Sequence, residues 1–288
     1  MDFSKYKLSG INYGGSEKKI GIYVNGNKYM LKFQKNTVFG KRNNHLSECI
    51  GSRIFELIGI PVQKVYLGTY KGENVVACKD FINDLEQFVP FNDVGESTID
   101  IDISKYQYTY ENIMFMLEEN KKITNVEETI SMFWNMYIVD AFIGNFDRHG
   151  NNWGFIKNNN KYKLAPIFDN GSCLYPQMID EHQMELIIDS DEETDKRIYS
   201  YPTSQIKIDD KKSSYYDVIY STRFDECNKA LIRIYNKIDI KRINDIIDNI
   251  ENISEIHRKF YKHMIRERYE KIIKKTYIKL MGVEEWKV

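Results

Sequence analysis

A long apolar helix pattern that ends at a dense polar segment constrains this chain more than any other feature. Apolar side chains recur at helical spacing over residues 126–143 and form one wide face. Asn125, with Glu128 three residues later, predicts a capped start for this helix. The pattern ends at Gly144, and the polar segment Asn145-Phe-Asp-Arg-His-Gly-Asn-Asn152 follows directly. A helix this apolar must be buried, so we expect a rigid core to hold the polar segment.

A predicted strand pair follows the polar segment and returns the chain toward it. The strands are expected at Trp153–Lys157 and Tyr162–Ile167, with Asn158-Asn-Asn160 as their turn. Asp169 comes directly after the second strand, in Phe-Asp-Asn-Gly171. Because a hairpin brings its two ends together, we expect Asp169 to lie beside the polar segment.

The first 83 residues carry a β pattern interrupted by one helix. Asn25-Gly26 favours a tight hairpin turn, because both residues tolerate positive φ. Apolar residues at helical spacing predict a helix over 44–58, which Gly59 ends. The predicted strands are 19–24, 28–33, 62–70 and 74–81.

From residue 84 onward the pattern is mainly helical. Helices are predicted at 106–119, 126–143 and through 226–281, while the polar segments 84–104 and 189–215 are expected to form loops. The order predicts an α+β fold with a β-rich lobe over 1–83 and a helical lobe over 84–288. A nucleotide would suit the cleft between two such lobes.

Composition and charge exclude several classes of protein. The 288 residues carry a net charge of −1, which gives no overall attraction to nucleic acid or to an anionic membrane. The four cysteines lack the spacing of a disulfide framework or a zinc site. The N-terminus lacks a signal-peptide pattern, and no apolar run approaches the ~18 residues of a membrane span. We expect a soluble cytoplasmic protein without membrane insertion.

The polar segment and Asp169 together supply the groups that phosphoryl transfer needs. One carboxylate must take the proton of an attacking hydroxyl, and Asp147 fits that role. Mg²⁺ prefers hard oxygen ligands, which Asn152 and Asp169 offer. Arg148 or His149 is expected to brace the segment or to contact phosphate. A turn followed by a polar loop without chemistry is the alternative, but the spacing and the helix-to-hairpin context favour function.

These residues resemble a known family. Asn145-Phe-Asp-Arg-His-Gly-Asn-Asn152, followed by Leu164-Ala-Pro-Ile-Phe-Asp169, is similar to the catalytic core of the HipA-like serine/threonine kinases, in their short form without the extra N-terminal domain. The resemblance implies a protein-kinase-like two-lobe fold, ATP and Mg²⁺ as cofactors, and transfer to Ser or Thr of a protein. The Asp-Arg-x-x-x-Asn and Asp-Asn-Gly patterns also resemble type II phosphatidylinositol 4-kinases, so a lipid acceptor stays open.

The resemblance extends to single residues of the first lobe. Lys32 resembles the strand lysine that contacts the α- and β-phosphates, and Glu48 resembles its acidic partner. Strand periodicity leaves open whether Lys32 faces the nucleotide or the solvent, and Glu48 also fits an ordinary exposed helix position. Lys79, Asp80 and Phe81 fall where the hinge between the lobes binds adenine through its backbone.

A glycine-containing segment resembles the family's phosphate loop. It reads Gly14-Gly-Ser-Glu-Lys18, so Gly14, Gly15, Ser16 and Lys18 are expected near phosphate, where glycines let backbone N–H groups approach closely. Ser16 departs from the family, which commonly has a longer polar side chain there. As a pattern without context, Gly-Gly-Ser is typical of a plain loop.

The resemblance also implies autophosphorylation of a loop near the nucleotide. Ser9, Ser16 and Thr37 are the nearest hydroxyls in the sequence, and the sequence does not choose among them. Some members of the family are toxins with an antitoxin partner, which a single chain cannot reveal.

Two rival functions and two further segments complete the analysis. A lipid kinase needs a basic or aromatic membrane surface, whereas 84–104 is acidic. A non-catalytic nucleotide-binding protein is disfavoured because no catalytic group is missing. The basic final helix, 258–275, is either a solvated face or a docking surface for an acidic partner, nucleic acid or phospholipid. The segment 190–204 is either an activation or substrate loop or disordered.

Overall fold

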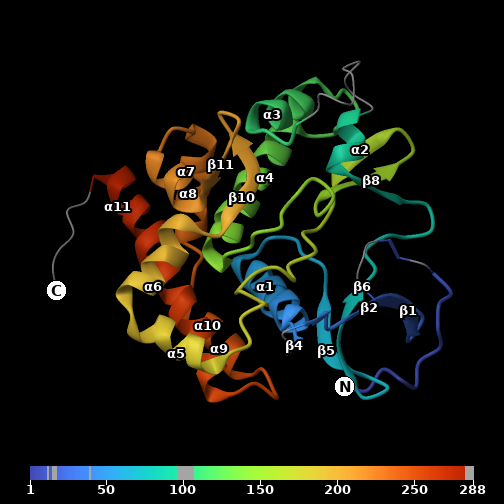
Figure 1. Cartoon of the computed structure of the whole chain (residues 1–288). Helices are drawn as coiled ribbons and strands as arrows, with labels where there is room; N and C mark the ends of the chain where they lie inside the picture. Colours follow the sequence, from blue (N-terminus) through green and yellow to red (C-terminus); the bar gives the residue numbers. More distant parts are fainter. Residues whose placement is uncertain (12, 15–17, 39, 97–106, 283–288) are drawn as a thin grey trace.

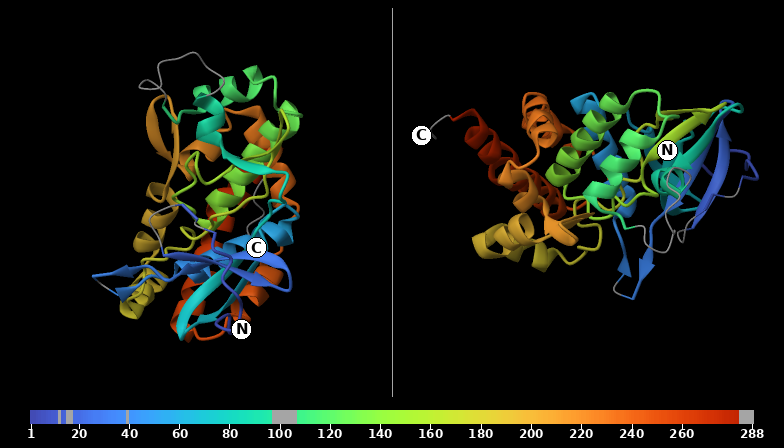
Figure 2. Two further views of the ribbon diagram at one scale, coloured as in Figure 1. Left: turned by 90° about the vertical axis from the view of Figure 1, so that its right-hand side faces the viewer. Right: turned by 90° about the horizontal axis from the view of Figure 1, so that it is seen from above.

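The protein is described by a computed structural model that covers residues 1–11, 13–14, 18–38, 40–96 and 107–282. A β-rich N-terminal part lies on one side of the molecule and a mainly helical part on the other (Figure 1). The view from above in Figure 2 places the N-terminal strands at one end and the C-terminal helices at the other. The structure is therefore mixed α+β, as the sequence predicts.

A four-stranded antiparallel sheet forms the N-terminal part. Its order is β1 (Lys19–Val24), β2 (Asn27–Phe33), β6 (Glu73–Lys79) and β5 (Val65–Tyr70). Asn25 and Gly26 both have positive φ in the turn between β1 and β2, as an Asn-Gly hairpin requires. A short hairpin of β3 (Asn36–Thr37) and β4 (Gly40–Lys41) follows.

The two faces of the sheet have different roles. Leu31 and Phe33 of β2 are buried on one face, in a small core that Phe3 completes. Side chains alternate along a strand, so Lys32 lies on the opposite face, where its cross-strand neighbour Val76 belongs to the main core. That face packs against α1 (Asn44–Ile58).

Helix α1 connects the sheet with the helical part. It begins and ends where the sequence predicts, and Gly59 closes it in the left-handed conformation. It packs against β5 and β6 on one side and against α9 (Ile240–Asp248) on another, and Figure 1 shows it between the sheet and the C-terminal helices. The N-terminal sheet and the helical part therefore share one core.

A three-stranded antiparallel sheet holds the polar segment. Its strands are β7 (Gln87–Pro90), β8 (Gly154–Asn158) and β9 (Lys161–Leu164), so the hairpin predicted after residue 152 is confirmed and β7 is an addition. Helix α4 (Val126–Ile143) begins beside this sheet, where the Thr124 backbone N–H donates to the Tyr162 carbonyl of β9 at 3.1 Å. Asn125 caps α4 by accepting from the Glu128 backbone N–H at 3.1 Å, and Gly144 ends it with φ of 67°.

The remaining elements are mostly helices. They are α2 (Phe91–Glu96), α3 (Tyr110–Glu119), α5 (Glu181–Asp189), α6 (Asp191–Asp195), the π-helix η2 (Lys196–Ser200), α7 (Tyr215–Ser221), α8 (Asp225–Tyr235), α10 (Glu255–Arg268), the π-helix η3 (Tyr269–Lys274) and α11 (Lys275–Met281). Strands β10 (Thr203–Ile208) and β11 (Lys211–Ser214) form a separate antiparallel pair.

The prediction of a long loop over 189–215 is wrong. This stretch contains α6, η2, β10 and β11. Ser190 caps α6 by accepting a hydrogen bond from the Glu193 backbone N–H at 3.3 Å. Alternate residues of β10 are buried, as in a strand with one face against the core. Within the predicted 84–104 loop, β7 and α2 span 87–96, residues 84–86 belong to no helix or strand, and 97–104 lie outside the described residues. Within the described residues, no helix is both long and apolar enough to cross a bilayer.

Candidate functional site

A buried lysine between two carboxylates forms the centre of the site. Lys32 Nζ lies 2.8 Å from Glu48 Oε2 and 2.8 Å from Asp169 Oδ1. The Lys32 and Glu48 side chains expose 6% and 1% of their surface, whereas Asp169 exposes 37%. Three segments meet here, because β2 carries the lysine, α1 carries Glu48, and the chain after β9 carries Asp169. Lys32 therefore faces the interior, which strand periodicity left open.

The charges of this group stabilise one another. Burial alone would lower the pKa of Lys32, but Asp169 and Glu48 outweigh burial and hold that pKa well above its ordinary value. Burial alone would raise the pKa of Asp169, but Lys32 outweighs it and lowers the pKa of this carboxyl. The Lys32 ammonium and the Asp169 carboxylate thus remain charged near neutral pH.

Asp147 lies half-exposed beside this group. Its side chain exposes 42% of its surface, and its backbone N–H donates to Asn145 Oδ1 at 3.2 Å. Burial raises the pKa of its carboxyl, and the nearby charge of Asp169 adds to this, while His149 opposes it. Asp147 therefore meets two requirements of a general base, since it is open to a substrate and binds a proton more tightly than an ordinary aspartate.

Asn152 is held so that one oxygen faces away from its own loop. Its amide nitrogen donates to the Asp147 carbonyl at 2.8 Å, which leaves Oδ1 as the acceptor for a cation. Oxygen atoms of Asn152 and Asp169 are hard ligands of the kind that Mg²⁺ takes alongside phosphate oxygens and water. Within the described part of the chain, no cluster of three or more His, Cys, Asp or Glu forms a metal site. A metal held by Asn152 and Asp169 would take its remaining ligands from phosphate or water.

Arg148 braces the segment from within. It is buried, and its guanidinium makes a bidentate pair with Asp140 of α4, with Nε–Oδ2 of 2.9 Å and Nη2–Oδ1 of 3.1 Å. It also donates to the Asn152 carbonyl at 2.8 Å, to the Phe168 carbonyl and to Asn170 Oδ1. Of the two roles expected for Arg148, the structure shows the bracing contacts.

His149 lies on the outside of the same segment. Its side chain exposes 41% of its surface, with Nε2 3.9 Å from Asp147 Oδ1. Its Nδ1 accepts from the Asn151 backbone N–H at 3.2 Å. His149 is therefore placed beside the half-exposed carboxylate, not in the buried brace.

Sequence analysis missed three residues that hold the site together. Asp140 receives Arg148 and also accepts from Asn145 Nδ2 at 2.9 Å. The Asn170 backbone N–H donates to Glu48 Oε1 at 3.0 Å, and its side chain donates to Ser52 Oγ at 3.0 Å. A lone aspartate inside the apolar run 137–143 was the available signal for Asp140, because a buried charge requires a partner. Asn170 lies within the Asp-Asn-Gly pattern, which gave it no role of its own, and no local pattern marks Ser52.

The predicted phosphate loop is only partly brought to the site. The Gly14 carbonyl accepts from Lys19 Nζ at 2.8 Å. Lys18 Nζ instead pairs with Glu73 at 2.6 Å and lies 4.1 Å above the Phe33 ring, on the sheet face opposite Lys32. Gly15 and Ser16 lie outside the described residues.

The predicted hinge lies at the end of β6. The Lys79 backbone N–H donates to the Lys64 carbonyl at 2.8 Å, and that of Asp80 donates to the Lys28 carbonyl at 2.9 Å. The Phe81 ring lies 5.8 Å from that of Phe168, the residue before Asp169. Phe88 of β7 contacts both rings, with centroid distances of 6.0 Å and 5.1 Å. An aromatic cluster thus joins the hinge to the segment that carries Asp169.

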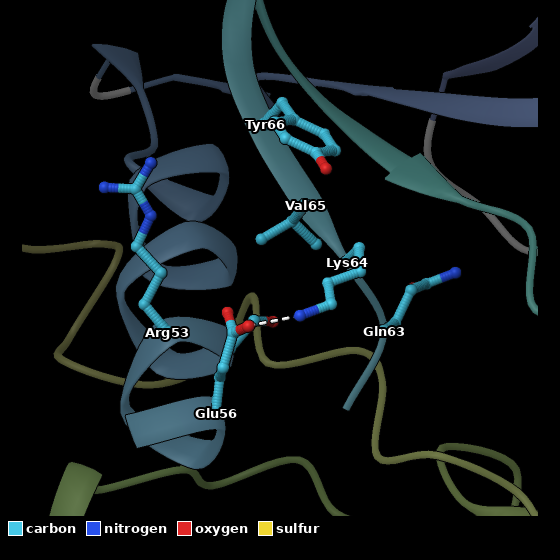
Figure 3. Close-up of a pocket in the computed structure, with 7 residues that line it drawn as sticks. Arg53, Glu56, Gln63, Lys64, Val65 and Tyr66 are labelled. Carbon is cyan, nitrogen blue, oxygen red and sulfur yellow. Dashed lines mark hydrogen bonds and ion pairs between the residues drawn. The ribbon is translucent and has the colours of Figure 1, made fainter. Parts of the chain in front are cut away.

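A cavity of about 220 Å³ lies between α1 and β5 (Figure 3). The ion pair between Glu56 and Lys64 crosses it, as the figure shows. Ser52, which lines this cavity, is the residue that accepts from Asn170. The other lining residues are Arg53, Gln63, Val65 and Tyr66. None of the predicted site residues lines this cavity.

Comparison with known proteins identifies the family of the chain. The family model described as HipA-like C-terminal domain matches residues 11–275. Serine/threonine-protein kinase CtkA of Helicobacter pylori is 38% identical over 267 residues, which cover 90% of this chain and 82% of that protein.

Solved structures give the same result. The crystal structure of the Helicobacter pylori proinflammatory kinase CtkA matches with a TM-score of 0.89 and 35% identity, over 98% of both chains. A chain of the Shewanella oneidensis toxin–antitoxin complex of HipA, HipB and operator DNA matches with a TM-score of 0.53 and 14% identity, over 95% of this chain and 67% of that chain. The second match shows a shared fold alone, and the kinase-like fold expected from the sequence is confirmed. The chain therefore belongs to the HipA-like C-terminal domain family and is a HipA-like serine/threonine protein kinase.

Proposed function

We propose that this kinase transfers the γ-phosphoryl group of Mg²⁺-bound ATP to a Ser or Thr hydroxyl of a protein, its own chain included. The observation that carries the proposal is the buried Lys32 between Glu48 and Asp169, with the half-exposed Asp147 beside them. A buried cation that is kept charged suits a polyphosphate ligand, because desolvation strengthens its attraction to phosphate oxygens.

Each residue has a proposed role in the transfer. Lys32 binds the α- and β-phosphates, and Glu48 holds the ammonium in position. Asn152 and Asp169 bind Mg²⁺, which neutralises charge on the phosphates as the transition state forms. Asp147 takes the proton of the acceptor hydroxyl. A bond forms between the hydroxyl oxygen and the γ-phosphorus, the bond to the bridging oxygen breaks, and ADP leaves with that oxygen.

The brace around Arg148 supports this proposal because the chemistry depends on positioning. A loose transition state gains little from covalent chemistry, so the enzyme must fix the base and the metal ligands relative to each other. Arg148 donates to the carbonyl of Asn152 and to the carbonyl of Phe168, the residue before Asp169. A rigid link between these ligands is therefore built into the fold.

Intact-mass measurement after incubation with Mg²⁺-ATP tests the proposal. We expect the wild-type chain to gain whole phosphate units and an Asp147→Asn variant to gain none. Asp210→Asn is the matched control, since Asp210 is exposed and Asn tolerates its positive φ of 60°. A wild-type chain that gains no phosphate and consumes no ATP with protein substrates would rule the proposal out.

Mapping the phosphate then tests the expected autophosphorylation sites. Ser9, Ser16 and Thr37 remain the candidates, and we expect at least one of them to be modified. Phosphate found only in the C-terminal half would contradict autophosphorylation near the nucleotide.

A further inference from the structure

A second cavity lies next to the proposed catalytic base. Its volume is about 270 Å³, and we call it the Phe146 pocket. Phe146 directly precedes Asp147, so the pocket begins one residue from the base. It is lined by Phe146, Tyr175, Gln177, Tyr201, Pro202, Thr203 and Gln205.

Hydrogen bonds fix the walls of the Phe146 pocket. Gln205 Nε2 donates to the Phe146 carbonyl at 2.7 Å, and Lys212 Nζ donates to Gln205 Oε1 at 3.1 Å, so both ends of this amide are held. The Tyr175 hydroxyl donates to the Arg197 carbonyl at 2.9 Å. Strand β10 is thus hydrogen-bonded to Phe146, and η2 is hydrogen-bonded to Tyr175 on the other side of the pocket.

A buried arginine supports the same wall from behind. Arg268 is fully buried and donates from Nη1 to the Arg197 carbonyl at 2.7 Å and from Nε to the Ala141 carbonyl at 2.6 Å. Ala141 lies in the last turn of α4, the helix that leads into the catalytic segment. Pocket and base therefore keep a fixed relation to each other.

The chemistry of the lining selects an uncharged guest. None of the described lining residues carries a charge, whereas Arg53, Glu56 and Lys64 line the cavity of Figure 3. Two cations contact lining residues, but Arg197, 5.6 Å from the centre of the Tyr201 ring, pairs with Glu193, and Lys212 donates to Gln205. A charged side chain entering the Phe146 pocket would therefore lose water and compete with these existing contacts for an ion partner. Aromatic surface is available to an apolar guest, since Tyr201 exposes 42% of its area. The volume lies just below the roughly 300–1,000 Å³ typical of sites for whole small ligands, and it suits a single side chain.

We propose that the Phe146 pocket binds an apolar or aromatic side chain of the protein substrate, within two residues of the phosphoacceptor. An extended chain advances about 3.3–3.6 Å per residue, and the pocket begins one residue from Asp147. A side chain one or two positions from the acceptor therefore reaches it. The inference rests on the proposed protein-kinase function and adds the class of substrate sequence that this kinase prefers.

A positional-scanning library of Ser- and Thr-containing peptides tests the pocket. At one position within two residues of the acceptor, the wild-type chain should favour Leu or Phe over Asp and Lys by about tenfold or more. Tyr201→Ala should weaken this preference. Gln177→Glu, at an exposed lining residue, should instead introduce selection for Lys or Arg at the same position. Tyr66→Ala is the matched control, because Tyr66 exposes 45% of its area and lines the other cavity, so selection should not change.

The outcomes separate the pocket from the function it rests on. Flat selection, selection for charged residues by the wild type, or selection unchanged in both pocket variants would overturn the pocket assignment. Autophosphorylation without phosphorylation of any library peptide would also overturn it, while leaving the proposed function intact. A chain that phosphorylates neither itself nor any peptide would overturn the proposed function and this inference with it.

Discussion

At the scale of one residue, Lys32 is a buried charge that two carboxylates from distant parts of the chain hold in place. Its side chain is almost fully buried, and its two partners come from positions 16 and 137 residues away in the sequence. A buried ion pair is weak evidence for added stability, because desolvation offsets the attraction of the charges. We therefore expect the pair to be needed for activity, and its disruption to be costly only when one partner is left alone.

Replacing Lys32 by Met should abolish phosphoryl transfer and lower the free energy of unfolding by roughly 3 kcal/mol, because Glu48 then stays buried without its partner. Adding Glu48→Gln should recover much of that stability but no activity. Urea unfolding and intact-mass measurement on both variants check this. If Lys32→Met alone and Lys32→Met with Glu48→Gln were equally stable, the unpaired buried charge of Glu48 would not be the cause of the destabilisation.

Asp147 should trade stability for function. Burial in the folded state raises the pKa of this carboxyl. Above that pKa, the ionised Asp147 therefore lowers the free energy of unfolding. Asp147→Asn removes the penalty and should raise the melting temperature at pH 7 while abolishing activity. The gain should shrink as the pH falls through the raised pKa, where the wild-type carboxyl becomes protonated. Calorimetry across pH measures this, and a lower melting temperature at pH 7 would contradict it.

Sequence analysis identified the candidate site residues but not the contacts that hold them. Asp147, Asn152 and Asp169 were proposed from their spacing, because a hairpin returns the chain to its start. The orientation of Lys32 required the structure, since its direction depends on Phe3 and Phe33 covering the opposite face. Asn170 required it too, because its partners lie in α1 and in the polar segment, both distant from it in sequence.

At the scale of elements, the Arg148 brace joins α4 to the segments of both proposed metal ligands, Asn152 and Asp169. Arg148→Lys cannot reproduce the bidentate pair with Asp140 and should cost roughly 3 kcal/mol of unfolding free energy, with activity strongly reduced. Arg223→Lys is the matched control, because Arg223 makes a similar pair with Asp209 at an exposed site. Its midpoint of urea unfolding should stay near the wild-type value. Equal shifts in both variants would show that burial of the brace is unimportant.

Elements with strong local signals were predicted well, and those held by tertiary contacts were not. Helices 44–58 and 126–143 begin and end at the predicted residues, since a capping residue or a terminal glycine fixes their limits. The 189–215 stretch was predicted to be a loop because it is polar. Its π-helix η2 is instead stabilised by contacts from distant residues, with Arg268 and Tyr175 both donating to the Arg197 carbonyl.

At the scale of the whole molecule, the predicted lobes share a core. Cys49 and Cys78 in the N-terminal part belong to the same buried cluster as Cys173 and Cys227 in the helical part. His257 of α10 also lies within hydrogen-bonding distance of Asn43 at the start of α1, with their side-chain nitrogens 3.2 Å apart. The boundary near residue 83 therefore separates two patterns of sequence, and we expect no independent folding of residues 1–83.

Thiol labelling during urea unfolding tests this expectation. Burial raises the pKa of all four cysteine thiols, so they should react only after the core opens. Cys49 and Cys78 should become labelled at the same urea concentration as Cys173 and Cys227, as measured by mass spectrometry of alkylated peptides. Earlier labelling of the first two would show that the N-terminal sheet unfolds separately.

The pairing of Lys32 with two carboxylates also determines how the binding of ATP and the binding of a metal ion should affect each other. Asp169 already pairs with the Lys32 ammonium to which a polyphosphate would bind. Because Asp169 belongs to the same molecule, it competes with the polyphosphate at a high effective concentration. Two carboxylates around one ammonium repel free ATP, whereas a divalent cation bound to Asp169 would reverse the local charge. Metal and nucleotide should therefore bind with positive cooperativity, each raising the affinity for the other by the same factor.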